Sequence, residues 1–252
     1  MPIIGMINQK GGVGKTTSAI NLAAALAEHR SVLLVDLDPQ ANASSGLSVR
    51  TPELTIYDVL VGQTPARQAI YPTEFGNLKI LPASPDLSGA AVELDASSES
   101  LNLLAKALIG VRPNYDFIIV DGPPSLGALT LNVLVAADQL VIPLQTEYYA
   151  LEGIARMTDT VERIRASLNP RLTILGILLT MFDSRTRLSQ DVAANVREHF
   201  GDLVFDAVIP RNVRLAEAPS FGQPIFAYAP TSQGALAYER LAEEVIDRVS
   251  QT

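Results

Sequence analysis

Apolar runs recur along the chain at regular intervals, with polar segments between them. Seven runs are nearly unbroken and rich in valine, isoleucine and leucine: residues 3–7, 32–35, 78–81, 117–120, 140–144, 172–181 and 204–209. Such runs are typical of strands buried on both faces of a parallel sheet. Helical periodicity separates them at residues 16–28, 126–136, 151–168 and 188–200. The alternation predicts one α/β domain over residues 1–252, with a doubly wound, mostly parallel sheet and helices on both faces.

Polar residues directly follow most of these runs. In an open parallel sheet, ligands bind at the carboxyl ends of the strands, so these residues are expected to meet at one edge. They occupy positions 8–17, 36–40, 121–124, 145–147, 183–185 and 210–212.

The first of these segments, residues 8–17, reads NQKGGVGKTT. A glycine-rich turn between a strand and a helix points several backbone N–H groups at one anion, while Lys15 adds a mobile charge and the Thr16 hydroxyl can ligate Mg²⁺. The segment therefore predicts a phosphate-binding loop. The usual pattern has glycine where this chain has Gln9, and the loop carries a second lysine, Lys10. Spacing alone leaves Lys10 open between a special role and a solvated loop charge.

Three aspartates follow the buried runs. Asp121 fits a carboxylate that binds Mg²⁺ through water beside the loop, with capping of the next helix as the alternative. Asp36 and Asp38 are separated by one residue at the end of a strand, so their side chains lie on the same side. Two such carboxylates repel unless they divide tasks, one near Mg²⁺ or Lys15 and one orienting the attacking water. Position does not say which is which, and an N-cap role for Asp38 is the alternative.

Composition narrows the class of protein. Hydrophobic residues make up 48% of the chain and charged residues 18%, which supports a large core and argues against disorder. The absence of cysteine excludes disulfides, thiol catalysis and cysteine-ligated iron–sulfur clusters. No apolar run approaches 18 residues, so the protein is expected to be cytoplasmic.

The net charge of −8 argues against nucleic acid, but its distribution is uneven. Residues 151–214 hold nine arginines and eight carboxylates, which leaves −9 on the remainder, so a local arginine patch is compatible with an acidic protein. The amphipathic segment 235–249 has a net acidic polar face, so it is expected to pack on the domain and not on a membrane. The candidates for the patch, with solvated surface charge as the alternative, are Arg185, Arg187, Arg211 and Arg214.

The loop at residues 10–17, KGGVGKTT, resembles the deviant Walker A loop of the ParA/MinD family of P-loop ATPases. Four further stretches resemble its Soj-type branch, the short chromosome-partitioning ParA proteins: residues 35–40, 121–125, 148–153 and 209–220. The similarity extends from residue 3 to 250. It implies a P-loop NTPase fold of the deviant Walker A type and hydrolysis of ATP with Mg²⁺.

The resemblance also implies roles for individual residues. Lys10 would cross the interface of an ATP-sandwiched homodimer to the partner's phosphates, Asp38 would be linked to water activation, and both would be catalytic together with Lys15. Asp36 would lie nearer the magnesium and Lys15. The expected nucleotide contacts are Gly11, Gly12, Val13, Gly14, Lys15, Thr16 and Thr17 at the phosphates, and Pro210, Arg211 and Asn212 by the adenine. Thr16, Asp36 and Asp121 would hold the metal, and Arg185 and Arg214 would bind DNA.

The family's partners complete the expectation. The ATP-dependent homodimer would bind double-stranded DNA non-specifically, associate with the nucleoid, and be released when a ParB (Spo0J-like) protein stimulates hydrolysis, with no membrane involved. Gln233 stands where close relatives often carry arginine, which would weaken the DNA surface or arrange it differently. The alternatives are a MinD-like membrane-cycling ATPase, disfavoured by the acidic last helix, and a P-loop metabolic ligase or kinase, which would not explain Lys10.

Overall fold

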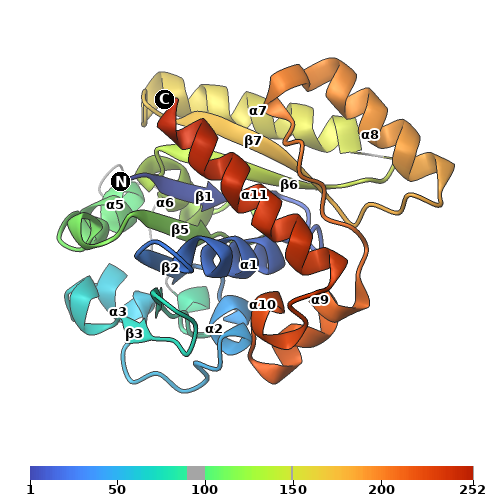
Figure 1. Ribbon diagram of the computed structural model, residues 1–252. Coiled ribbons are helices and arrows are strands. Elements are labelled where there is room, and N and C mark those ends of the chain that lie inside the picture. Colours follow the sequence, from blue (N-terminus) through green and yellow to red (C-terminus); the bar gives the residue numbers. More distant parts are fainter. Residues whose placement is uncertain (90–99, 149, 252) are drawn as a thin grey trace.

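The computed structural model describes residues 1–89, 100–148 and 150–251 (Figure 1). Its centre is a seven-stranded sheet in the order β3-β4-β2-β5-β1-β6-β7. Neighbouring strands are parallel except for the antiparallel pair of β3 and β4. The predicted class of fold is confirmed. The strands are β1 (Ile3–Met6), β2 (Val32–Asp36), β3 (Tyr71–Pro72), β4 (Leu78–Leu81), β5 (Phe117–Asp121), β6 (Gln139–Gln145) and β7 (Thr173–Thr180).

Helices connect most of the strands, and the four predicted from periodicity are confirmed to within two residues at each end as α1, α6, α7 and α8. The α-helices are α1 (Lys15–Ala27), α2 (Asn42–Gly46), α3 (Ile56–Leu60), α5 (Leu103–Ile109), α6 (Ala128–Ala136), α7 (Ala150–Ser167), α8 (Arg187–Phe200), α9 (Val213–Glu217), α10 (Ile225–Tyr228) and α11 (Gln233–Ser250). Short 3₁₀ turns span Ala66–Gln68, Ser100–Asn102, Arg112–Asn114, Gly201–Leu203 and Ala218–Phe221.

Alternate side chains of the strands build a separate core on each face of the sheet. In β2, Val32 and Leu34 belong to the core with α1 and α11, whereas Leu33 and Val35 belong to the core with α3, α5, α6, α7 and α8. Helices α1 and α11 cover the same face in Figure 1. Because the central strands are covered on both faces, their sequences are apolar throughout instead of alternating.

Helix α11 packs as its pattern predicts. Leu241 and Val245 are fully buried in the core shared with α1, while Glu239 and Glu243 on the other side of the helix are exposed. Its apolar face is therefore already covered by the domain. In the described part of the chain, no helix is both long enough and apolar enough to cross a bilayer.

The register of the central strands gathers polar residues at one edge of the sheet. Asp36 lies opposite Asp121 in the pairing of β2 with β5, and Asp121 lies opposite Met6 in the pairing of β5 with β1. The glycine-rich loop after β1 and the turn after β2 therefore leave the sheet on either side of Asp121.

The prediction of a strand at residues 204–209 is wrong. The segment runs beside β7 but makes isolated bridges, between Val204 and Ile177 and between Pro210 and Phe182. Pro210 also has no N–H to donate to a ladder. The two-residue strand β3, by contrast, has no apolar run to predict it and lies at the sheet edge, where its proline is tolerated.

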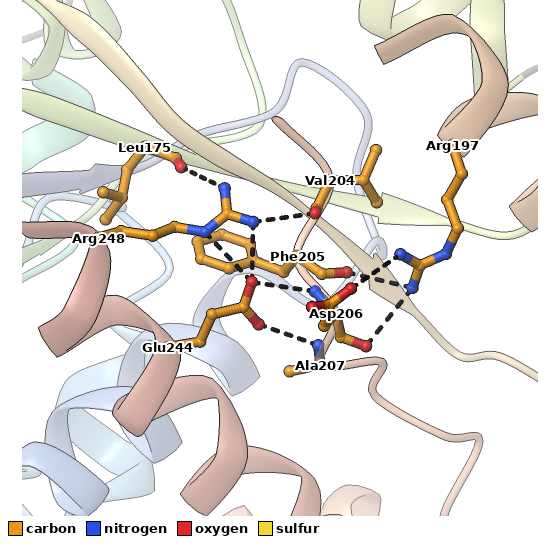
Figure 2. Close-up of polar contacts among 8 residues, drawn as sticks. All are labelled: Leu175, Arg197, Val204, Phe205, Asp206, Ala207, Glu244 and Arg248. Atoms are coloured by element: carbon orange, nitrogen blue, oxygen red, sulfur yellow. Dashed lines mark hydrogen bonds and ion pairs between the residues drawn. The ribbon is translucent and has the colours of Figure 1, made fainter. Parts of the chain in front are cut away.

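Side chains occupy the backbone groups that a ladder would use in this segment (Figure 2). The Arg197 guanidinium donates to the carbonyl oxygens of Phe205 and Asp206, at 3.2 and 3.4 Å. The Glu244 carboxylate accepts from the N–H groups of Asp206 and Ala207, both at 3.0 Å. Helices α8 and α11 thus hold the segment from both sides, and a continuous strand does not form.

Candidate functional site

The glycine-rich loop is held open by side chains from neighbouring strands. The Asn8 side-chain amide donates to the carbonyl of Pro143 in β6 at 2.7 Å, and its oxygen accepts from the Lys10 N–H at 2.9 Å. From the end of β7, the Thr180 hydroxyl donates to the Val13 carbonyl at 2.8 Å. These contacts use the Lys10 N–H and the Val13 carbonyl, and they tie the loop to β6 and β7.

Left-handed backbone gives the loop its turn. Gly12 and Gly14 have φ of 75° and 87°, values that a residue with a Cβ adopts only with strain. Gly14 directly precedes α1, so Lys15 and Thr16 stand at the N-terminal end of that helix. The first helix of the chain therefore begins with its N–H groups and positive dipole end at the predicted phosphate site.

The two loop lysines differ sharply in environment. Lys15 is buried, and its ammonium donates to the Lys10 carbonyl at 3.2 Å. Burial lowers the Lys15 pKa, while Asp121 and Asp38 oppose that shift. The Lys10 side chain is instead 52% exposed and forms an ion pair with Glu147, just after β6. Lys15 is therefore an internal cation of the loop and Lys10 an outward one.

The three predicted aspartates meet at this edge, all buried, but they are not equivalent. Burial, and next the neighbouring Asp36, raise the pKa of Asp121 well above its usual range, against the opposing influence of Thr16 and Lys15. Neither Asp121 carboxylate oxygen meets a donor in hydrogen-bond geometry within the described residues. Burial also raises the pKa of Asp36, to about 6, against hydrogen bonds that it accepts from Ser44.

The magnesium ion that the resemblance implies fits the surroundings of the Asp121 carboxylate. A fully buried carboxylate without a donor is costly unless a cation or its water shell joins it, and Asp121 is such a group. Thr16 faces it from the first turn of α1. The described residues contain no group of three His, Cys, Asp or Glu side chains that would form a full protein cage for a metal. This pattern suits Mg²⁺, which keeps several waters and binds substrate phosphates.

A cavity of about 370 Å³ adjoins the loop on the side of β7. Gly14 and Thr17 line it together with the three residues predicted beside the adenine, so the structure brings these distant segments together. Met181 also lines the cavity, with a left-handed φ of 51° directly after β7. The three residues in question are Pro210, Arg211 and Asn212.

The two arginines predicted to bind DNA are exposed and ion-paired. Arg185 is 84% exposed and donates through its Nε and a terminal nitrogen to both oxygens of Asp183, at 2.9 and 2.8 Å. Arg214 pairs with Glu217 at 2.9 Å. Arg185 lies before α8 and Arg214 in α9, and backbone joins the segments before them, since the Arg211 N–H donates to the Phe182 carbonyl at 2.9 Å. Both arginines therefore belong to one continuous region beside the cavity.

Sequence reasoning missed several residues that shape the site. Thr180 anchors the loop, Glu147 holds Lys10, and Ser44 binds Asp36, yet each is an ordinary polar residue in its local sequence. Because Glu147 follows a predicted strand, the sequence placed it among the polar residues at the carboxyl ends of the strands. Nothing in the sequence indicated that it pairs with Lys10. Tyr149, in the stretch 148–153 that resembles the Soj-type branch, lies outside the described residues.

A glycine-rich loop with a buried lysine, set between the first strand and first helix of a parallel sheet, defines a P-loop nucleotide-binding domain. The family model described as an AAA domain matches residues 1–174. The chain is 55% identical to the chromosome-partitioning ATPase Soj of Thermus thermophilus over 98% of this chain and 95% of that protein. It is 51% identical to the chromosome partitioning protein ParA of Caulobacter vibrioides, over 98% and 94% of the two chains.

A solved structure gives the same fold. Cobyrinic acid a,c-diamide synthase from Mycobacterium smegmatis, with bound ADP and magnesium, has a TM-score of 0.87 at 35% identity, over 99% of this chain and 95% of that one. Together with the outward lysine in the loop, these similarities settle the family. The chain belongs to the ParA/MinD family of deviant Walker A P-loop ATPases, in its Soj-type branch.

Proposed function

We propose that this protein is an ATP-driven DNA-segregation switch of the ParA/Soj type. The observation that carries the proposal is the direction of Lys10. Lys15 already occupies the interior of the loop, whereas the Lys10 ammonium points outward and is half exposed. A lysine so placed serves a phosphate held by another molecule better than one in its own loop. We therefore expect two copies to join around ATP, with Lys10 of each reaching the nucleotide of the other.

Hydrolysis follows from the residues at the sheet edge. The loop N–H groups and Lys15 bind the phosphates, and Asp38 accepts a hydrogen bond from the attacking water. The water oxygen bonds to the γ-phosphorus as the bond to the β–γ bridging oxygen breaks, which yields phosphate and ADP. When bound beside Thr16 and Asp121, magnesium neutralises charge on the phosphates. Because Lys10 has a phosphate partner only in the ATP dimer, hydrolysis removes the group that joins the subunits.

Dimerisation would bring Arg185 and Arg214 of both subunits onto one surface. Arg185 and Arg214 are exposed and lie in one region beside the nucleotide cavity, which supports a DNA-binding surface that depends on the nucleotide. Few phosphate contacts make such binding weak in a monomer and stronger in a dimer. A ParB-type partner with a basic segment suits the acidic chain, and nucleoid association in the ATP state follows from DNA binding.

The similarity to a cobyrinic acid a,c-diamide synthase supports a metabolic alternative, in which the loop activates a small carboxylate with ATP. That alternative leaves the outward Lys10 and the paired arginine loops without a task. A MinD-like membrane cycle is not favoured, since the apolar face of α11 is buried. The partition ATPase remains the function that the site supports best.

DNA binding measured with ATP, ADP and no nucleotide at two salt concentrations tests the proposal. We expect ATP-dependent binding that is indifferent to sequence. Two arginines from each subunit would neutralise about four phosphates, so affinity should fall roughly 100-fold between 50 and 200 mM salt. Lys15→Ala, which cannot hold ATP, is the control that should bind no better with ATP than without. Equal affinity with ATP and ADP, or no binding at low salt, would contradict the proposal.

A further inference from the structure

The carboxylate of Asp36 is held by the protein on both oxygens. Asp36 ends β2 and is 0% exposed. Its Oδ2 accepts from the Ser44 N–H at 2.8 Å and from the Ser44 hydroxyl at 2.7 Å, and its Oδ1 accepts from the Asp38 N–H at 3.2 Å. Asp121, the residue opposite it in β5, has neither oxygen occupied within the described residues. The two neighbouring carboxylates therefore have different tasks: Asp121 is free to meet a ligand, and Asp36 is an internal anchor.

Ser44 is the residue that makes Asp36 an anchor. It is 1% exposed and lies in α2, eight residues after the carboxylate that it binds. Its hydroxyl donates to Asp36 and accepts from the Ala83 N–H at 3.0 Å, just after β4. The single hydroxyl proton is thus assigned to Asp36, since the contact with Ala83 uses the oxygen as acceptor. Ser44 therefore ties α2 to the ends of both β2 and β4.

The turn between these two residues carries Asp38. The Gln40 N–H donates to Asp38 Oδ1 at 3.0 Å, and the Ala41 N–H donates to the Asp38 carbonyl at 2.9 Å. Ala41 then adopts a left-handed φ of 50°, an uncommon conformation for a residue with a Cβ, directly before α2. Such a conformation persists only where the surroundings hold it. The Asp36 carboxylate accepts from the Asp38 N–H at the start of the turn. Ser44, which follows the turn, donates to the same carboxylate and so fixes the other end.

From this geometry we infer that Ser44 is a positioning residue for ATP hydrolysis. By binding the Asp36 carboxylate with both its N–H and its hydroxyl, Ser44 closes the turn that places Asp38. The inference rests on the proposed function, in which Asp38 orients the attacking water. It assigns Ser44 no contact with the nucleotide, so its loss should slow the chemical step without weakening nucleotide binding.

Ser44→Ala tests the inference, with Ser45→Ala as the matched control. Ser45 is the next residue of α2, and its hydroxyl donates to the Asn42 carbonyl of the same helix at 3.3 Å. A displaced group can cost about 10²-fold in rate, so we expect kcat for ATP to fall about 10- to 100-fold in Ser44→Ala. Ser45→Ala should match the wild type, and Ser44→Thr, which keeps the hydroxyl, should stay within a few-fold of it.

Binding of a fluorescent ADP analogue with and without Mg²⁺ provides the second readout, together with thermal unfolding. If Ser44 only positions Asp38, its loss should lower the rate of hydrolysis and leave the affinity for ADP within about 3-fold of wild type. Both are measured well below the temperature of unfolding. If Ser44→Ala does not fold, Ser44→Cys has nearly the same volume with a poor donor and should show the same split.

The outcomes separate cleanly. Unchanged kcat in folded Ser44→Ala overturns the inference while leaving an active wild type and the proposed function intact. A loss of ADP affinity equal to the loss of kcat also overturns it, since Ser44 would then shape the nucleotide site as a whole. A wild type without ATPase activity overturns both the proposed function and this inference.

Discussion

At Asp121, the proposed binding of magnesium and the stability of the fold make opposite demands on one residue. It is completely buried beside two other buried carboxylates, and Lys15 is the buried ammonium among them. Burial is the main cause of its raised pKa, and Asp36 adds to it. In the unfolded chain the same carboxyl ionises near 3.8. The folded state therefore loses stability as the pH rises above that value, where only the unfolded state gives up its proton.

Replacing Asp121 should therefore stabilise the nucleotide-free protein. Asp121→Asn should raise the free energy of unfolding at pH 7.5 by about 1–3 kcal/mol, since the neutral amide folds without the proton uptake that the raised pKa of the buried carboxyl imposes. The gain should vanish below about pH 4, where the wild-type carboxyl is protonated in both states. Urea unfolding at several pH values measures it.

The matched control is Asp159→Asn on the exposed side of α7, which should change stability by less than about 0.5 kcal/mol. In the same Asp121→Asn variant, the gain in ADP affinity on adding Mg²⁺ should shrink. A destabilised variant at pH 7.5 would show that another partner compensates the carboxylate.

At the scale of elements, the end of α11 joins the sheet to the segment that leads to the cavity beside the glycine-rich loop (Figure 2). The Arg248 guanidinium donates to the carbonyl oxygens of Leu175 in β7 and Val204, both at 2.9 Å, and to Glu244 at 2.8 Å. It also lies over the Phe205 ring, 4.3 Å from the centroid. One side chain thus ties a helix, a strand and a strand-like segment together, which explains why residues 204–209 stay beside β7 without a full ladder.

Arg248→Ala should lower the free energy of unfolding by about 2–3 kcal/mol, because hydrogen bonds to a charged group are lost and carbonyls lose their donor. Arg240→Ala, an exposed position on the same helix, is the control and should stay within about 0.5 kcal/mol of wild type. Denaturant unfolding followed by circular dichroism measures both. Equal effects of the two substitutions would mean that the contacts of Arg248 add nothing to the packing of α11.

At the scale of the whole molecule, an acidic protein presents two ion-paired arginines beside the cavity that adjoins the glycine-rich loop. Asp183 and Glu217 hold Arg185 and Arg214 in defined directions. Hydrogen bonds from Arg185 keep the pKa of Asp183 well below its usual range, so this pair stays charged across the physiological range. Each pair is locally neutral, so under the proposed function a monomer would bind DNA weakly. The proposed dimer would double the number of arginines that phosphates can engage.

Arg214→Ala should lower the affinity of the ATP-bound protein for DNA roughly 10- to 100-fold and reduce the salt slope by about 2, since two phosphate contacts are lost per dimer. ATP-dependent dimerisation, followed by light scattering, should persist. The matched control is Arg30→Ala, an exposed arginine between α1 and β2 at the opposite edge of the sheet. An unaltered salt slope would remove Arg214 from the DNA surface.

The local sequence was enough to predict most of the strands and the conformation of the glycine-rich loop. The apolar runs predict six of the strands in the described chain, because strands buried on both faces need apolar residues at every position. The conformation of the loop at residues 10–17 can be predicted from its own sequence. Gly12 and Gly14 permit left-handed backbone, and Lys15 and Thr16 follow at the start of the helix. Chemistry and conformation are there encoded within one short stretch, so no distant contact is needed to read them.

Tertiary structure alone decided the rest, because the deciding contacts join residues far apart in the chain. Side chains of α8 and α11 turn the apolar run at 204–209 away from a strand. The pairing of β2 with β5 sets Asp36, which Ser44 binds, opposite Asp121, which has no hydrogen-bond donor among the described residues. An aspartate carries no mark of its future neighbours, and burial and hydrogen bonding arise only when the strands assemble. The sequence by itself determined that the chain has a glycine-rich loop of the phosphate-binding type, and the fold decided which carboxylate is bound by Ser44 and which one has no hydrogen-bond donor among the described residues.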